Sequence, residues 1–222
     1  MKKKYIFIAF LSFFLIGIVP PLLVSNGVPF SHAASAFSLG LTILGQLFAS
    51  FVLHYFCIKF VLSSPHTQKH VIALLSCGTI CFGLLMLIYA AIESLCFFFP
   101  HIFAAKQFAI FSGSAFLWVL FIISLATGAV YEEVVYREFL PELVLFFTDA
   151  AHSWHWLRPA VELGAVLVFA FSHRYLGLPA VINAALSGAV LRYCFCKTGT
   201  IYTGCTIHFL YNVLLIMFSL LA

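Results

Sequence analysis

The sequence predicts an all-α fold: a polytopic bundle of about seven or eight transmembrane helices around an intramembrane polar cavity. Of its 222 residues, 64% are hydrophobic and only 8% are charged, and the mean hydropathy is +1.13. A soluble domain of this size cannot hide so much apolar surface, because much of its exterior must be hydrated. The sequence repeatedly contains apolar runs of roughly 20 residues, the length that a helix needs to cross a hydrocarbon core of about 30 Å. The alternating ten-residue segments typical of a transmembrane β-barrel do not occur.

Eight helices are expected in order along the chain. Stretches rich in Gly, Pro and Ser separate most of them. Their expected ranges are 5–24, 38–63, 71–98, 108–130, 131–149, 160–173, 178–196 and 200–221. Lys2, Lys3 and Lys4 precede the first run, which favours a cytoplasmic N-terminus and, in a bacterium, the cytoplasmic membrane. That run is longer than the apolar region of a usual signal peptide, so it is predicted to remain as a membrane helix.

The chain is expected to form one structural domain with two functional parts. Residues 1–107 are predicted to be scaffold helices, because they carry few polar residues, and residues 108–222 are predicted to be a catalytic core. The expected helix at 131–149 contains four acidic residues before position 143, and Pro141 lies in its interior. Whether this helix crosses the membrane completely stays open, and with it the side on which the C-terminus lies.

The charge distribution and the cysteine spacing argue against nucleic-acid binding and against a disulfide or zinc framework. The net charge is +4, but basic residues cluster only at the N-terminus, so nucleic acid is not an expected partner. The expected partners are the lipid bilayer and a peptide or membrane-protein substrate. No cysteine pair has C-x-x-C spacing, which predicts packed thiols rather than a disulfide framework or a zinc knuckle. The seven cysteines are Cys57, Cys77, Cys81, Cys96, Cys194, Cys196 and Cys205. Arg192 is expected to extend its guanidinium toward the membrane surface.

Acidic residues concentrate in the octapeptide YEEVVYRE, residues 131–138, which holds three of the seven carboxylates in the chain. Glu133 and Arg137 are four residues apart, so they lie on one helix face and can pair. Glu132 is turned by about 100° from Glu133. A charged residue at membrane depth costs at least about 2.5–3.5 kcal/mol, and such residues usually face a water-filled cavity. The octapeptide therefore predicts a functional site, although a purely structural ion pair would also explain Glu133 and Arg137.

Two further pairs have helical spacing. Phe169 and His173 end one apolar run, and His208 and Asn212 lie in the middle of the last one. A carboxylate with one histidine can deprotonate a water molecule, and a second histidine with an amide can donate hydrogen bonds to an oxyanion. These residue types therefore outline amide hydrolysis without a covalent intermediate. A solvated His173, polar contacts between helices, and a zinc site built from two histidines and a glutamate are the alternatives.

The order of the motifs resembles the type II CAAX prenyl endopeptidase family, also called the CPBP or ABI family of intramembrane glutamate proteases. The pattern of that family is Glu-Glu-x-x-x-Arg, then Phe-x-x-x-His, then His-x-x-x-Asn or Asp. This sequence has the three motifs in the same order, and the match covers about half of the chain. KTGTI at 197–201 is similar to the Thr-Gly turn of the family. Glu138 departs from the pattern, because many members have Gly directly after the Arg, which puts the local packing of this helix in question.

The resemblance implies a role for each motif residue. Glu132 would activate water with help from His173, while His208 and Asn212 would stabilise the oxyanion. The family's glutamate mechanism implies no metal and no cofactor. The remaining residues would shape the site: Glu133, Arg137 and Phe169.

An intramembrane endopeptidase is therefore the leading hypothesis, and its substrate would be a membrane-associated or prenylated peptide. Two alternatives belong to other classes. The first is a non-enzymatic membrane protein of the same fold, with a bacteriocin-immunity or scaffold role. The second is a proton-coupled transporter that uses Glu132 and Glu133 as a carboxylate relay.

Overall fold

The computed structural model describes residues 2–23, 35–61, 71–103, 113–148 and 156–221. Every regular element in these ranges is a helix, which confirms the all-α prediction. The elements are α1 (Lys2–Phe13), η1 (Phe14–Ile18), α2 (Val19–Leu23), α3 (Ala36–Phe56), η2 (Cys57–Val61), α4 (Val71–Phe98), α5 (Ala115–Glu133), η3 (Val134–Phe139), α6 (Leu140–Thr148), α7 (Leu157–Ser172), η4 (Arg174–Leu176), α8 (Leu178–Thr198) and α9 (Ile201–Leu221). Turns η1 to η3 are π-helical, and η4 is a 3₁₀ turn.

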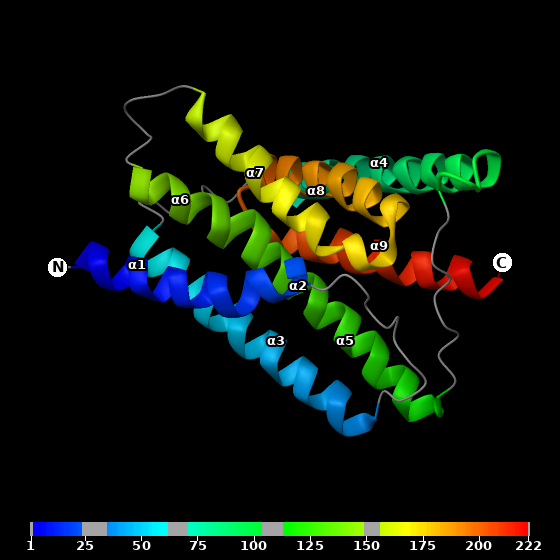
Figure 1. Ribbon diagram of the computed structural model, residues 1–222, viewed down its shortest axis with the longest axis horizontal. Coiled ribbons are helices and arrows are strands. Elements are labelled where there is room, and N and C mark those ends of the chain that lie inside the picture. Colours follow the sequence, from blue (N-terminus) through cyan, green and yellow to red (C-terminus); the bar gives the residue numbers. More distant parts are fainter. Residues whose placement is uncertain (1, 24–34, 62–70, 104–112, 149–155, 222) are drawn as a thin grey trace.

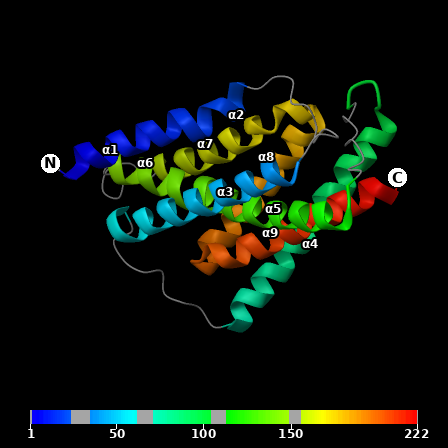
Figure 2. The ribbon, with the colours of Figure 1, turned by 90° about the horizontal axis from the view of Figure 1, so that it is seen from below.

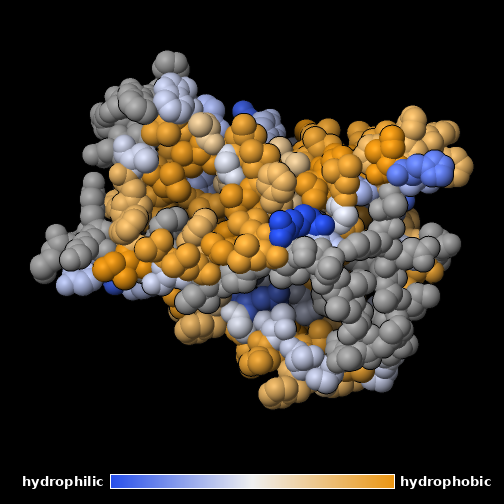
Figure 3. Space-filling view, viewed as in Figure 1, coloured by the Kyte–Doolittle hydropathy of each residue, from blue (hydrophilic) through white to orange (hydrophobic). Residues whose placement is uncertain are grey.

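Five of these helical segments are long and apolar enough to cross a membrane. They are Ala36–Lys59, Val71–Phe98, Ala115–Thr148, Leu178–Thr198 and Ile201–Leu220. Large apolar side chains on them are exposed, among them Phe37, Phe48 and Phe97. The face in Figure 3 is accordingly mostly hydrophobic, with few strongly hydrophilic residues near its centre. The chain is thus a multi-pass integral membrane protein. The segment Lys2–Leu23 is not among the five, so its crossing of the membrane stays a prediction.

A single helix made of α5, η3 and α6 runs through the middle of the bundle, from Ala115 to Thr148 (Figure 1). The predicted division at 130–131 is wrong, because the chain stays helical there and instead takes a wider π-helical turn at Val134–Phe139. Through α5 this helix packs against α3 and α9, and through α6 it packs against α7. The charged octapeptide therefore lies in the centre of the fold.

Arg192 explains how the helix continues through Pro141. Proline has no N–H, so in an α-helical pattern the carbonyl four residues earlier loses its donor. That carbonyl belongs to Arg137, and it accepts a hydrogen bond from Nη1 of Arg192 on α8. A side chain from a neighbouring helix thus satisfies the backbone group that proline frees, as membrane helices require.

The last three helices pack against the central helix and α4. α8 lies between α4 and α7, and α9 contacts α4, α5 and α8, as the two views of the bundle in Figures 1 and 2 show. Gly199 ends α8 with a φ of 71°, a left-handed conformation that glycine adopts without strain. This turn reverses the chain in the predicted KTGTI stretch. It returns α9 across α5, where His208 meets the two glutamates.

The N-terminal helices contact the core directly. Oγ1 of Thr127 on α5 donates a hydrogen bond of 2.6 Å to Oε1 of Gln46 on α3. The functional division at 107/108 stays a prediction.

Candidate active site

Two adjacent glutamates at the end of α5 lie in different surroundings. The side chain of Glu132 is 29% exposed, whereas that of Glu133 is 1% exposed. The difference follows from helix geometry, because consecutive residues point about 100° apart. Glu133 faces α9, whereas the side chain of Glu132 is partly accessible.

His208 on α9 lies between these two carboxylates. Its Nδ1 is 2.9 Å from Oε1 of Glu133, and its Nε2 is 3.5 Å from Oε2 of Glu132. An ionised carboxylate only accepts hydrogen bonds, so the short contact assigns a proton to Nδ1. His208 as a residue is 5% exposed. Helices α5 and α9 therefore meet through a carboxylate–imidazole–carboxylate arrangement.

Arg137 lies beneath this arrangement and is almost completely buried. Its Nε is 3.4 Å from Oε1 of Glu133, as the four-residue spacing predicted. The guanidinium stacks over the ring of Phe169 at 3.9 Å, a cation–π contact. Within the described part of the chain, none of its three nitrogens makes a hydrogen bond, and neither does Oε2 of Glu133. The pair therefore carries buried donors and an acceptor that hydrogen-bonding partners would stabilise.

Phe169 connects the three predicted motifs. Its ring centroid lies 4.7 Å from that of His173 and 6.3 Å from that of His208, both in edge-to-face geometry. The ring of Tyr136 on η3 packs against it at 5.2 Å. An aromatic residue at this position thus fixes the separation of α7 from η3 and α9.

His173 follows the last residue of α7, and its ring is oriented by the backbone. Nδ1 of His173 donates to the carbonyl of Phe169 at 2.9 Å, and Oγ of Ser172 donates to the same carbonyl at 2.7 Å. With the Nδ1 proton used in this way, neutral His173 presents Nε2 as an acceptor. The side chain is partly exposed, which suits a group that contacts water.

Asn212 lies one helical turn beyond His208 on α9 and is partly buried. Among the described residues it makes no hydrogen bond to Glu132 or Glu133. The structure thus joins six of the seven predicted site residues through direct contacts and places the seventh one turn away on the same helix.

Two glycines outside the predicted motifs allow the close packing of the site. A Cβ on Gly204 would lie 2.7 Å from Oε2 of Glu133. A Cβ on Gly188 of α8 would lie 3.0 Å from Cδ1 of Phe169 and 3.6 Å from Nη2 of Arg137. Small residues at helix contacts are common in membrane proteins. The four-residue spacing of Gly204 and His208 was a signal that could have drawn attention to the first of them.

Glu138, the departure from the family pattern, has a partner in the scaffold. Glu138 is 3% exposed, and its Oε2 lies 2.7 Å from Nδ1 of His54 on α3. Because His54 lies 84 positions earlier, helical spacing could not predict this pair. The N-terminal helices therefore hold the π-helical turn from one side.

Arg192 holds the same turn from the other side. The prediction that its guanidinium reaches the membrane surface is wrong, because the residue is 4% exposed. Nη2 of Arg192 lies 3.2 Å from Glu142 and 3.0 Å from Glu162, and Nη1 donates to the Arg137 carbonyl. Burial is tolerated because two carboxylates and a carbonyl surround the charge.

The chain was also compared with known protein families. Residues 113–214 match the family described as Type II CAAX prenyl endopeptidase Rce1-like. This match confirms the resemblance that the three motifs predicted: slightly less than half of the chain is similar to this family. The family is one of CAAX-type membrane proteases. Comparisons with curated proteins and with solved structures gave no significant match.

Proposed function

We propose that the protein is an intramembrane endopeptidase in which Glu132 activates a water molecule to hydrolyse a peptide bond. Its substrate would be a membrane-associated peptide, and a prenylated C-terminal segment is the substrate class that the family favours. The observation that carries this proposal is the contrast between the adjacent glutamates, one accessible and one buried, with His208 between them.

Glu132 suits the role of general base because it is the accessible carboxylate. A general base must reach the water whose proton it removes, and the 29% exposure of Glu132 allows this. Glu133 is engaged by His208 and Arg137 and is 1% exposed. It therefore acts as a positioning residue that sets the orientation of His208.

His173 is proposed to orient the water beside Glu132. Burial raises the pKa of Tyr175, and the negative charge of Glu132 raises it further. Tyr175 lies two residues after His173, so this part of the chain is within electrostatic reach of Glu132. The acceptor Nε2 of His173 would then hold the same water that Glu132 deprotonates.

His208 and Asn212 are proposed to stabilise the oxyanion of the tetrahedral intermediate. In its doubly protonated form, His208 donates through Nδ1 to Glu133 and presents a second N–H at Nε2. The amide of Asn212, one turn along α9, offers a further donor. Pre-oriented donors at a site away from bulk water are among the largest contributions to catalysis by proteases.

Cleavage assays on the purified full chain in nanodiscs test this proposal. The probes are fluorescence-quenched peptides with a C-terminal CAAX sequence, each with and without a farnesyl group, and a peptide of transmembrane length. Glu132→Gln is compared with Glu93→Gln, a matched control because Glu93 is an exposed glutamate on α4. Cleavage by the unmodified protein and by Glu93→Gln, lost in Glu132→Gln, supports the proposal.

Two outcomes would contradict it. Folded protein that cleaves none of the probes and changes no probe mass would favour a scaffold or immunity role. Proton-dependent solute flux in proteoliposomes that requires Glu132, without any cleavage, would favour a transporter. The farnesylated and unmodified peptides separately decide whether the prenyl group is recognised.

A further inference from the structure

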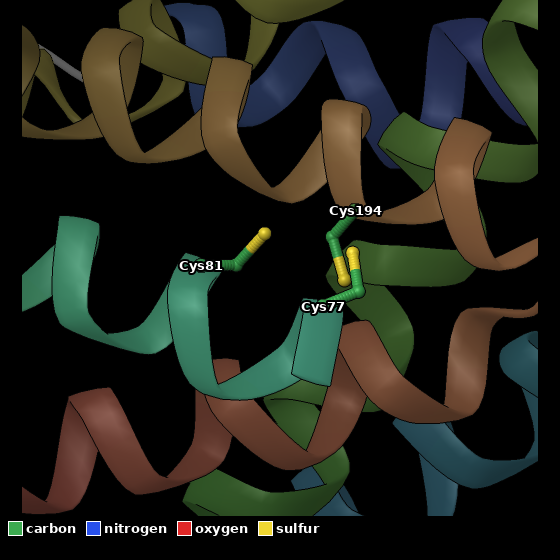
Figure 4. A group of neighbouring side chains, drawn as sticks. All are labelled: Cys77, Cys81 and Cys194. Carbon is green, nitrogen blue, oxygen red and sulfur yellow. The ribbon is translucent and has the colours of Figure 1, made fainter. Parts of the chain in front are cut away.

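Three cysteine side chains converge between α4 and α8, away from the proposed catalytic residues. Cys77 and Cys81 are four residues apart on α4, so their side chains share one helix face. Cys194 lies opposite them on α8, and in Figure 4 the three side chains occupy the space between the two helices. Their sulfur atoms lie within 4.8 Å of one another.

We propose that these three thiols form a binding site for one monovalent, thiophilic metal ion of the Cu(I) type. This goes beyond the proposed proteolysis and does not depend on it. Thiolate ligands select soft metal ions such as Cu(I) over harder divalent ions that prefer oxygen. Among the residues that the structure describes, this is the only set of at least three His, Cys, Asp or Glu side chains with ligand atoms at metal-binding separation.

The distances fit three-coordinate binding. Three sulfurs in a plane, each about 2.3 Å from a central metal, lie about 4 Å from one another. Sulfurs that already lie within 4.8 Å need to move inward by less than about 1 Å. Side-chain rotation on two packed helices supplies such a movement without a change in the backbone.

The surroundings favour Cu(I) over Zn²⁺. Cys81 and Cys194 are completely buried, and the side chains around them are apolar, including Leu85 and Leu191. Zn²⁺ at structural sites takes four ligands in a tetrahedron, and the described His, Cys, Asp and Glu residues supply three. Met86 also packs against this hydrophobic cluster.

A metal ion can reach the three thiols, and its binding releases protons. Cys77 is partly exposed, so the ion can enter from the side of α4 and pass to the buried sulfurs. The bond that forms is Cu–S, and each thiol that binds as a thiolate releases its proton to the solvent. The oxidation state of the metal does not change, so no oxidant or reductant is consumed. A bound ion would join α4 to α8, the helix that also carries Arg192.

Anaerobic copper titration of the purified full chain in detergent tests the site. The probe is Cu(I) itself, supplied from a competing chromophoric chelator, with stoichiometry measured by elemental analysis after desalting. Cys81→Ser and Cys194→Ser are compared with Cys196→Ser, a matched control because Cys196 is exposed on the same helix. Thermal unfolding of each metal-free variant verifies that it is folded.

We expect one copper per chain in the unmodified protein and in Cys196→Ser. In Cys81→Ser and Cys194→Ser the affinity should fall at least 100-fold, more than the roughly 10–100-fold typical of losing a group that only orients a ligand. Copper binding should also raise the thermal unfolding temperature of the unmodified protein, because the ion binds the folded state. Equal copper retention by all four proteins, no retention by the unmodified protein, or tighter binding of Zn²⁺ than of Cu(I) would overturn the proposal.

Discussion

Glu132 and Glu133 are adjacent in the sequence, yet His208 contacts them through different nitrogens, Nε2 at 3.5 Å and Nδ1 at 2.9 Å. One imidazole therefore links an accessible carboxylate to a buried one. The two glutamates should respond differently to the same substitution, because one is placed to react with water and the other to hold the site together.

Replacing Glu132 by Gln should lower kcat/KM by roughly 10²–10⁴-fold, the usual contribution of a general base, while the protein stays folded. Gln has nearly the same shape but cannot accept the proton. Cleavage rates and size-exclusion profiles in detergent measure the two effects. Full turnover in this variant, with Glu93→Gln as the reference, would move the base to another group.

Replacing Arg137 by Ala should damage folding more than chemistry. The change leaves Glu133 buried without its cation, which typically costs about 3–5 kcal/mol, and it removes the stacking over Phe169. Yield and thermal unfolding in detergent provide the measurement. Arg158→Ala is the control, because Arg158 is 59% exposed and its ion pair with Glu162 is a surface contact, worth about 0–1 kcal/mol. A stable but inactive Arg137→Ala protein would instead give the guanidinium a catalytic role.

Replacing Gly204 by Ala should reduce activity strongly, because the added Cβ would lie 2.7 Å from Oε2 of Glu133. The carboxylate must then turn away, and the hydrogen bond to His208 would be lost. Gly164→Ala is the matched control on α7, where a Cβ meets no atom within 4 Å. That control should be neutral or stabilising by up to about 1 kcal/mol, as for Gly→Ala in a helix. Equal activity of the two variants would show that the position of Glu133 does not matter.

The pair of His54 and Glu138 should give a measurable coupling energy. His54→Phe alone should destabilise the protein because it leaves the buried Glu138 carboxylate without its partner, and Glu138→Gln alone should do so because it removes the charge that His54 contacts. The double variant should lose less than the sum, by about 1.5–3 kcal/mol, as expected for a hydrogen bond to a charged group. Thermal or denaturant unfolding of all four proteins gives the cycle. Additive effects would mean that the 2.7 Å contact contributes nothing to stability.

Proteolysis should survive treatment with 1,10-phenanthroline followed by dialysis, and elemental analysis should show well under one zinc per chain. In the proposed mechanism His173 and His208 have different tasks, and neither binds a metal. Asn212→Ala should then retain weak activity, because losing one oxyanion donor costs about 10²–10³-fold. Zinc at one per chain, lost with activity and restored on adding it back, would establish a metallopeptidase instead.

The sequence was sufficient to predict most of the helices, although it divided the central helix at 130–131. Apolar runs of sufficient length have no stable alternative in a membrane, because a helix satisfies its own backbone hydrogen bonds. The predicted ranges 71–98 and 178–196 accordingly agree with α4 and α8 to within two residues. The pairing of Glu133 with Arg137 was also predictable, because four-residue spacing on one helix is a local property.

The tertiary structure decided which residues from distant parts of the chain meet. His208 contacts both glutamates because Gly199 reverses the chain between α8 and α9, and no local rule gives that crossing. The same holds for Glu138 with His54, for Arg192 with the Arg137 carbonyl, and for the three cysteines of α4 and α8. Helical periodicity fixes which face a side chain occupies, but only the packing of the helices determines what that face touches.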